Sequence, residues 1–427
     1  MTRPKATRKL APKTAPRSAV LLGLCLAAAL AGCTAPAADA PAHETSAEEQ
    51  AALEELSADV DSSAAMRDFA ARLLSRCVDE DPERSTLVSP LSTLYALALL
   101  ENGAAGETLA QLEEATGITC EELTSYLSAY VVLAAEGPLD LANSVWLRDD
   151  DGLKVSDDFL EVCEQELGAQ AFLEPFDDTT AEAINSWVSE ETRGMIPSIV
   201  DHVSEGAMLY LVNALAFEGT WEEPYEDAFV QGDTFTCEDG TEKDVQMMLS
   251  SEDAYYESDL ATGFSRPYEG GYSFVALLPS EGVTAAELVA TLDGETLDEL
   301  LTPVANTVVD AYLPKFATTY DNELKDELRA LGVEDAFDAS RADLTPMGTG
   351  PTCPLYVSQV LHRTYIDVNE EGTRAAAATA VAPADGGAAP TDEPEVREVR
   401  LDRPFVYLIV DDRTGTPVLL GTYMGTE

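Results

Sequence analysis

Residues 208–217 read Met-Leu-Tyr-Leu-Val-Asn-Ala-Leu-Ala-Phe, an apolar run broken by one asparagine. The run predicts a β-strand, and similar strand-like runs cover residues 272–278, 308–313, 365–368 and 405–410. Helical stretches are predicted at residues 47–77, 92–100 and 181–190. Helix and strand patterns mix without a repeat, and no obvious linker interrupts residues 47–427. The sequence therefore predicts a single domain over that range.

The charge of the chain is extreme. It carries 25 Lys and Arg against 79 Asp and Glu, a net charge of −54. Residues 1–32 hold six of the basic residues and no acid, which leaves 19 basic against 79 acidic residues, a net charge of −60, in the rest of the chain. Such a field repels phosphate backbones at long range, so no nucleic acid is expected as a partner.

The first 32 residues have the layout of a targeting segment. Six basic residues precede an apolar run at 19–31 that is too short to span a bilayer as a permanent helix. Leu30-Ala31-Gly32-Cys33 follows and resembles the bacterial lipoprotein signal, in which the chain is cleaved before a lipid-bearing cysteine. We therefore expect an exported protein, lipid-anchored through Cys33 on the outer face of the cell membrane and open to shedding. An ordinary signal peptide with an unrelated cysteine is the alternative.

Residues 33–46 are rich in Ala and Pro and predict an extended tether. Five cysteines lie beyond it, at Cys77, Cys120, Cys163, Cys237 and Cys353. No pair has the short spacing of a zinc site, so neither a metal nor a cofactor is expected, and the sequence leaves open whether any disulfide forms. Cys77 closes an apolar series with the spacing of one helix face and is expected to be a buried thiol.

One long stretch differs from the rest of the chain. Residues 373–394 contain no apolar side chain larger than Val381 and are dominated by Ala, Gly, Pro, Thr and acids. Its composition alone indicates a disordered loop.

Signatures of catalysis are missing from the sequence. It has no Gly-x-Ser-x-Gly elbow, no His-Glu-x-x-His and no Gly-x-x-x-x-Gly-Lys, and residues 149–152 lack the spacing of a calcium loop. A serine or cysteine hydrolase would need His43, His202 or His362 as its base, and His43 lies in the tether. The chain is therefore not expected to be an enzyme.

Several strings occur along the chain in an order known from one family. They are Ser-Pro-Leu-Ser-Thr-Leu at 89–94, Asn-Gly-Ala-Ala-Gly-Glu-Thr at 102–108, Asn-Ser-Val-Trp-Leu at 143–147, Ile-Asn-Ser-Trp-Val at 184–188, Leu-Val-Asn-Ala-Leu-Ala-Phe at 211–217, Leu-Pro-Lys-Phe at 313–316, Val-Ser-Gln-Val-Leu-His-Arg-Thr at 357–364, Val-Asn-Glu-Glu-Gly-Thr at 368–373 and Arg-Pro-Phe at 403–405. In this order they resemble the serpins, a family of serine protease inhibitors, over roughly residues 60–425.

The resemblance implies the serpin fold, an α+β domain in which mixed β-sheets, one of them large and central, are surrounded by helices. It also implies an exposed reactive loop at about 372–400. Serpins offer this loop as bait to a protease and insert its cleaved N-terminal arm into their main sheet. Thr373 is expected to become buried as insertion begins, whereas Arg374 can face solvent because side chains alternate along a strand.

The resemblance further implies roles for single residues. The hinge of the loop comprises Glu370, Glu371, Gly372, Thr373, Ala375, Ala376, Ala377 and Ala378. The hydrogen-bonded cluster beneath the sheet opening, called the shutter, matches Ser89, Ser92, Asn213 and His362. The group at the top of the sheet where the loop inserts, called the breach, matches Trp221, Lys315 and Glu370. Lys315 and Glu370 are expected to form an ion pair, and an exposed pair worth under about 1 kcal/mol is the alternative.

The cleaved bond is expected among Gly386, Gly387, Ala388 and Ala389, by counting forward from the hinge. Counting back from Pro404 places it near Glu393, but insertion constrains only the arm before the cut. Residues 375–396 contain no Lys, Arg, Phe, Tyr or Leu, so trypsin-like and chymotrypsin-like pockets find no anchor. Small residues favour a protease of elastase or subtilisin type.

Two features depart from the family pattern. The loop is longer than usual, and Pro383 cannot donate to a ladder inside the inserting arm, which leaves efficient trapping open. Residues 121–136 are acidic and apolar, so no heparin-type activator is expected. The sequence thus predicts a monomeric inhibitor that traps serine proteases as covalent acyl-enzymes. A non-inhibitory serpin acting as a surface binding or adhesion module is the alternative.

Overall fold

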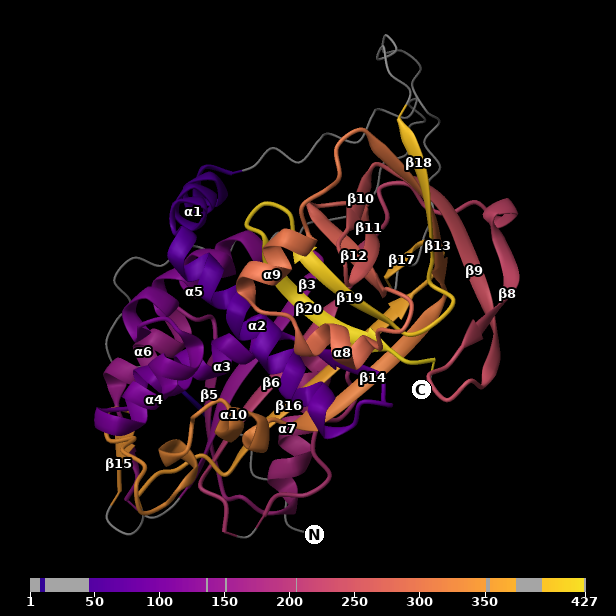
Figure 1. Ribbon diagram of the computed structural model, residues 1–427. Helices are drawn as coiled ribbons and strands as arrows, with labels where there is room; N and C mark the ends of the chain where they lie inside the picture. Colours follow the sequence, from indigo (N-terminus) through magenta and orange to yellow (C-terminus); the bar gives the residue numbers. More distant parts are fainter. Residues whose placement is uncertain are drawn as a thin grey trace, which may run out of the picture.

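The structure is a computed structural model that describes residues 8–11, 46–135, 137–149, 152–204, 206–350, 354–373 and 394–425. Most helices gather on one side of the molecule, and a four-stranded sheet with long strands lies on the other (Figure 1). Among the described residues, no helix combines the length and the apolar character that crossing a bilayer requires.

The described residues form ten α-helices. They are α1 (Ala47–Ala58), α2 (Val60–Glu80), α3 (Pro90–Asn102), α4 (Gly106–Thr116), α5 (Cys120–Ala134), α6 (Asp157–Gln165), α7 (Asp178–Glu191), α8 (Ala285–Ala290), α9 (Gly294–Leu300) and α10 (Lys325–Ala330). Two short 3-10 turns, η1 (Asp227–Phe229) and η2 (Asp335–Phe337), connect other elements.

The main sheet has its strands in the order β1-β5-β3-β6-β16-β17-β7, with β14 also paired to β16. These strands are β1 (Arg8–Leu10), β3 (Leu139–Arg148), β5 (Gln170–Glu174), β6 (Leu209–Phe217), β7 (Gly219–Thr220), β14 (Phe316–Glu323), β16 (Gln359–Val368) and β17 (Gly372–Thr373). Two pairs, β3 with β5 and β6 with β16, are parallel, and the other pairs are antiparallel.

Three further sheets complete the β structure of the described residues. The six-stranded sheet contains β10 (Ala254–Glu257), β11 (Ala261–Tyr268), β12 (Tyr272–Pro279), β19 (Phe405–Asp411), β20 (Thr416–Tyr423) and β2 (Thr86–Val88). The four-stranded sheet contains β18 (Glu395–Arg400), β13 (Thr307–Pro314), β9 (Glu242–Glu252) and β8 (Val230–Thr236). A small pair joins β15 (Gly348–Thr349) to β4 (Lys154–Val155).

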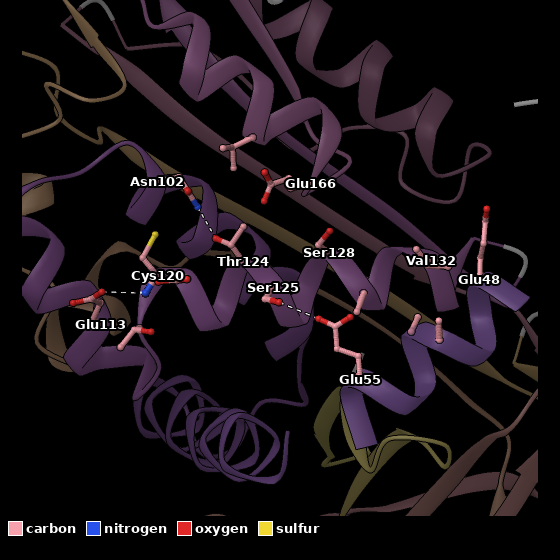
Figure 2. A pocket seen from close by; sticks show the side chains of 16 residues that line it. Glu48, Glu55, Asn102, Glu113, Cys120, Thr124, Ser125, Ser128, Val132 and Glu166 are labelled. Atoms are coloured by element: carbon pink, nitrogen blue, oxygen red, sulfur yellow. Dashed lines mark hydrogen bonds between the residues drawn. The ribbon is translucent and has the colours of Figure 1, made fainter. Parts of the chain in front are cut away.

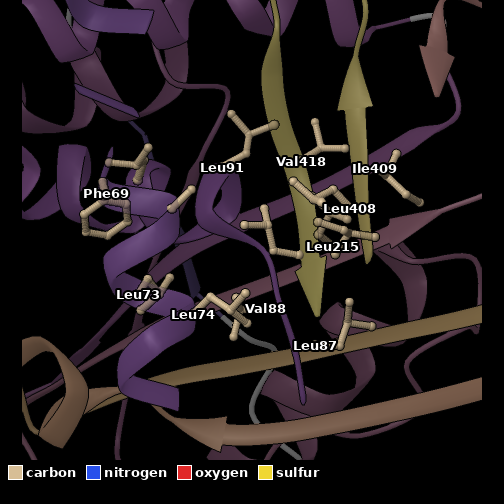
Figure 3. Close-up of a cluster of buried hydrophobic side chains, with 14 of the residues drawn as sticks. Phe69, Leu73, Leu74, Leu87, Val88, Leu91, Leu215, Leu408, Ile409 and Val418 are labelled. Carbon is tan, nitrogen blue, oxygen red and sulfur yellow. The ribbon is translucent and has the colours of Figure 1, made fainter. Parts of the chain in front are cut away.

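The hydrophobic core lies where α2 and α3 meet the six-stranded sheet and the inner face of the main sheet. Figure 3 shows Phe69 and Leu73 of α2 beside Leu91 of α3, with Leu408 of β19 and Leu215 of β6 across the gap. Helix α3 is buried from Pro90 to Glu101, which agrees with its apolar character on all sides. Helix α3 therefore packs against the inner face of the main sheet.

The single helix predicted at residues 47–77 is wrong, because the structure breaks it into α1 and α2 at Asp59. The backbone of Asp59 leaves the helical region, with φ −90° and ψ 72°. Its carboxylate then accepts a hydrogen bond from Ser62 N at 3.0 Å and caps α2. An aspartate side chain can accept hydrogen bonds from backbone N–H groups and so end one helix and cap the next. The spacing of apolar residues does not reveal such a cap.

Strand β1 comes from the segment that the sequence assigns to a signal peptide. Residues 8–10 pair antiparallel with the outer edge of β5. The structure is that of the full chain, in which this basic segment caps the sheet edge. Cleavage before Cys33 would remove the strand. That cleavage, the tether and the domain boundaries stay predictions.

Candidate functional site

The centre of the main sheet is a parallel pair of strands that has separated at one end. Residues 359–365 of β16 pair with residues 210–216 of β6. Beyond them β17 lies between the two strands, because Thr373 pairs antiparallel with Val368 of β16 and with Gly219 of β7, which follows β6. The sheet is thus open by one strand at this end and closed below it; β17 is labelled in Figure 1.

A tight turn at residues 369–371 leads the chain from β16 into β17. Asn369 N donates to Gly372 O at 2.9 Å, and Glu371 N donates to Asn369 Oδ1 at 2.9 Å. Gly372 has φ +155°, and a Cβ there would lie 2.1 Å from Gly219 O. Any side chain at position 372 would therefore push β17 away from β7.

Thr373 is fully buried in the intact chain. Its hydroxyl lies 2.6 Å from the hydroxyl of Tyr268, whose ring stacks on Trp221 with centroids 4.1 Å apart. Thr373 of the intact chain therefore already lies buried at the position where insertion is expected to begin. Its backbone is already held as a strand by both neighbours, which draws the side chain inward before any cleavage.

Residues 221–225 hold the turn from the side of β7. The indole Nε1 of Trp221 donates to Asn369 O at 2.9 Å. Trp221 N donates to Glu371 O at 3.1 Å, and Tyr225 N donates to Glu370 O at 2.9 Å. Three hydrogen bonds thus fix the turn that starts β17, and two of them come from Trp221, a residue predicted in the breach.

The ion pair expected between Lys315 and Glu370 is present, with Nζ and Oε2 2.5 Å apart. The hydrogen bond from Lys315 lowers the pKa of the Glu370 carboxyl. The side chains are 28% and 36% exposed, so the pair contributes no more than about 1 kcal/mol to stability. Its part in loop insertion stays a prediction.

A buried ion pair that was not predicted from the sequence lies behind the turn. Arg266 of β11 forms it with Glu252 of β9, and the side chains of both are 7% exposed. The guanidinium also lies over the rings of Tyr225, at 4.0 Å, and Trp221, at 5.2 Å. Burial raises the pKa of Glu252 although Arg266 opposes this shift. No string in the sequence indicated this pair.

The four residues predicted in the shutter form one hydrogen-bonded cluster between α3 and the main sheet. Ser89 caps α3 by accepting from Ser92 N at 3.1 Å, and its own N–H donates to His362 Nε2 at 3.1 Å. Ser92 Oγ donates to Asn213 Oδ1 at 3.2 Å. Asn143 of β3, which lies in one of the family strings but was not predicted in the shutter, accepts from Asn213 Nδ2 at 3.0 Å.

His362 sits at the junction of the parallel pair, opposite Asn213 in the register. It is 1% exposed, and burial lowers its pKa to about 4. Because Nε2 accepts a hydrogen bond, the proton of the neutral ring is on Nδ1. Among the described residues, Nδ1 has no hydrogen-bond partner. The cluster is therefore satisfied except at one donor.

Four cysteines can be placed, and all four thiols are free. Cys77 is buried as predicted, Cys163 and Cys237 are also buried, and Cys120 is half-buried. Burial raises the pKa of Cys120 to about 11 and that of Cys163 to about 12. The described residues also include no group of three or more His, Cys, Asp or Glu side chains placed to hold a metal ion.

A groove of about 1080 Å³ runs between α1 and α5, far along the chain from the hinge. Figure 2 shows Glu55 of α1 accepting a hydrogen bond from Ser125 of α5 within it, and Cys120 N donating to Glu113. Most of its other lining side chains are small or acidic, and the exceptions are Asn102, Val132 and Val162. Residues of α1 and α5 line the groove, and its lining contains none of the residues predicted in the hinge, the shutter or the breach.

Several predicted site residues lie outside the described residues. They are Cys33, Arg374, Ala375, Ala376, Ala377, Ala378, Pro383, Gly386, Gly387, Ala388, Ala389 and Glu393. Cys353 lies outside them as well, so its pairing stays open. The scissile region and the outer hinge remain predictions from the sequence.

Together the fold and the site define a protein whose main sheet has begun to admit the strand that precedes a long loop. The family model described as Serpin (serine protease inhibitor) matches residues 64–425. The chain belongs to the serpin family, and the predicted α+β serpin fold is confirmed. Serpins are inhibitors of proteases and not catalytic enzymes, so family membership suggests protease inhibition.

Individual relatives cover most of the chain. Neuroserpin of Gallus gallus is 30% identical over 366 residues, 81% of this chain and 87% of that protein. The serine protease inhibitor of Cyanea capillata is 30% identical over 358 residues, 79% of this chain and 92% of that protein.

Solved structures give the same family. The thermophilic serpin Tengpin in its native state matches with a TM-score of 0.77 and 37% identity, covering 85% of this chain and 93% of that one. Thyroxine-binding globulin in complex with thyroxine matches with a TM-score of 0.73 and 23% identity, covering 85% and 98%, a likeness that shows the fold alone.

Proposed function

We propose that this protein inhibits serine proteases by the suicide-substrate mechanism, in which the cleaved loop inserts into the main sheet. The position of β17 carries the proposal. It is antiparallel to both β16 and β7, so a strand continuing from it would run between β6 and β16, antiparallel to both. Each residue added would exchange one parallel pair for two antiparallel pairs, which are slightly more stable per residue.

The register of β17 says where the arm would go. Thr373 lies opposite Val368 and Gly219, so the tenth residue after it, Pro383, would lie opposite Ser358 and Leu209. These positions are at or just outside the ends of β16 and β6, where a missing N–H does little harm. The proline then limits the length of the inserted strand and does not block it.

The same count places Thr379 between Asn213 and His362. Six residues separate it from Thr373, so it shares the inward face of Thr373. Insertion would bring a hydroxyl to the cluster that holds the unpaired Nδ1–H of His362. In the inserted strand Arg374 would lie on the opposite face, away from the core. The order of side chains in the arm therefore suits the interior that it would meet.

Small residues at Gly386 to Ala389 support a target of elastase or subtilisin type. The test is a denaturing gel of the protein mixed with pancreatic elastase, subtilisin or trypsin. A covalent complex with elastase or subtilisin, with cleavage mapped by mass spectrometry within 386–389, is the expected result. Complexes with trypsin but none with elastase would contradict the specificity. Cleavage by all three without any complex would instead favour the non-inhibitory alternative, in which the fold serves surface binding.

We further propose that the protein is exported and lipid-anchored through Cys33. The string before Cys33, the basic segment ahead of it and the Ala/Pro-rich tether after it support this location. Cys33→Ala should release the protein from the membrane fraction or leave it unprocessed. Unchanged membrane association, together with no acyl label on the wild type, would overturn the anchor.

A further inference from the structure

The outer edge of the main sheet, at β5, is a candidate docking site outside the inhibitory machinery. We propose that in the processed protein this edge binds an extended basic segment of a partner protein by strand addition. The proposal rests on the processing part of the proposed function, since cleavage before Cys33 removes Arg8–Leu10, which occupies the edge in the full chain.

Arg8–Leu10 shows how such a segment is held. Arg8 pairs with Leu173, Lys9 with Phe172 and Leu10 with Ala171, in antiparallel register. Main-chain pairing of this kind gives affinity in strand addition, and the side chains on alternate positions give specificity. The three residues therefore serve as an example of what the edge accepts.

Each position of the segment meets a different surface. Arg8 N donates to the Glu174 carboxylate at 3.0 Å, and Leu10 packs against the main hydrophobic core. Lys9 pairs with Phe172, which belongs to the second hydrophobic cluster on the α7 side of the sheet, so the two alternating faces of the segment meet different environments. The pattern favoured at this edge is a basic or polar residue, then a basic residue, then an aliphatic one.

A hollow of about 440 Å³ opens on the α7 side beside Phe172. Its aromatic side is formed by Trp146, Phe172 and Trp187, and its acidic side chains are Glu174, Glu182, Glu190 and Glu191. Acids next to aromatic faces favour an ammonium or guanidinium group over a neutral side chain. The hollow therefore favours Lys or Arg at the middle position, because Phe172, the residue paired with that position, lines it.

The acidic residues at the end of β5 also favour a basic segment. Burial raises the pKa of Glu174, Asp177 and Asp149 raise it further, and the Arg8 N–H bond opposes the shift. Without β1, the chain presents these acids beside an edge whose backbone groups lack a neighbour, a liability that proteins commonly cover. The net charge of −60 beyond the signal would steer a basic segment toward it.

The experiment uses residues 34–427, which contain the whole segment matched by the family. An acetylated and amidated peptide of residues 6–11 is added, and hydrogen exchange is followed by mass spectrometry. We expect amides at 170–174 to exchange at least fivefold more slowly with the peptide, with no comparable change elsewhere. Tryptophan fluorescence provides a second readout, because two of the three tryptophans, Trp146 and Trp187, line the hollow.

Matched controls separate strand addition from charge attraction. A scrambled peptide of the same composition and a peptide with Leu10→Asp should each bind at least tenfold more weakly. Glu174→Gln should weaken binding about tenfold, as expected for a lost charge-assisted hydrogen bond, whereas Glu164→Gln on α6 should not. Equal binding of the scrambled peptide, or binding without protection of 170–174, would overturn the proposal.

The outcome is distinguishable from failure of the proposed function. The gel assay of protease complexes reports inhibition and does not involve β5. The mass of the exported protein reports processing. If residues 8–10 remain on that protein, both the processing and the docking proposal are wrong, and β1 is a permanent cap of the sheet. If processing occurs and the peptide does not bind, only the docking proposal is wrong.

Discussion

At Thr373 the intact chain already has the surroundings that an inserted loop residue would have. Its side chain is buried, its hydroxyl meets Tyr268, and its backbone pairs on both sides. A residue in this position can keep the arm aligned for insertion only if it is small and uncharged. The hinge therefore depends on the identity of this residue as much as on the flexibility of the loop.

Thr373→Arg should convert the inhibitor into a substrate. An arginine cannot be solvated in this buried position beside the Tyr268 hydroxyl, so β17 should leave the sheet at a cost of roughly several kcal/mol. We expect the amount of covalent complex to fall at least tenfold while cleavage of the loop continues. Thr373→Ser, which retains the hydroxyl, is the control. An unchanged yield of complex for the arginine variant would show that β17 does not guide insertion.

Thr379→Val should weaken the inserted state alone. The variant keeps the shape of the side chain and removes the hydroxyl that insertion would bring to the shutter. We expect the stability gained on loop cleavage to fall by about 1–2 kcal/mol. Denaturant unfolding of the cleaved and intact forms measures this gain, and Ala378→Gly, on the other face, serves as a control. An equal gain in the variant and the wild type would contradict the register derived from β17.

His362 should make stability depend on pH. Burial lowers its pKa to about 4, whereas the unfolded chain titrates near 6.5, so protons bind the unfolded state more readily between these values. The contribution of His362 to the free energy of unfolding is complete above about pH 6.5. It is lost as the pH falls to 4, a change in that free energy on the order of 3 kcal/mol. Urea unfolding at several pH values should show a steeper acid loss for the wild type than for His362→Gln. Parallel curves would contradict this assignment.

At the scale of elements, apolar runs predicted some of the long strands and none of the short ones; β3 and β9, among the longest strands, had no predicted run. The run at 272–278 became β12, and that at 405–410 became β19, each extended by one residue. β7 and β17 have two residues each, which is too short to show any periodicity, and only their neighbours define them. The break at Asp59 was missed because a capping side chain outweighs the apolar pattern.

The residues of the candidate site were likewise predicted only in part. The four shutter residues and the Lys315–Glu370 pair were found from sequence strings. Asn143 and the buried Arg266–Glu252 pair were not, because their partners are distant in the chain and depend on strand register. A single sequence without the fold contains no signal for such contacts.

Gly372→Ala should destabilise β17 by more than the strain of a positive φ angle, because the added Cβ would also clash with β7. A Cβ at 372 would lie 2.1 Å from Gly219 O, whereas one at Gly194, which has φ +80°, would meet nothing within 4 Å. Gly194→Ala is therefore a matched control that should cost about 1 kcal/mol. We expect Gly372→Ala to lower the free energy of unfolding, measured with urea, by more than Gly194→Ala does. It should also speed hydrogen exchange at residues 219–220 and 372–373. Equal costs for both would show that β17 does not pack against β7 as described.

At the scale of the whole molecule, the proposed inhibitor keeps its main sheet one strand short. β6 and β16 pair along seven positions that a longer β17 would separate. A strand of about ten residues adds on the order of 10 kcal/mol if each new hydrogen bond contributes about 1 kcal/mol net. That difference between the intact and the inserted molecule is the energy available to distort an attached protease.

The most direct test of loop insertion compares the thermal unfolding of the intact protein with that of the protein cleaved once in the loop. The account predicts that the cleaved form melts well above the intact form, by more than about 10 °C, because the sheet gains a complete central strand. The protease must be removed and a single cut within 386–389 confirmed before the scan. Equal melting temperatures for the two forms would mean that the arm stays outside the sheet, and would contradict the inhibitory mechanism.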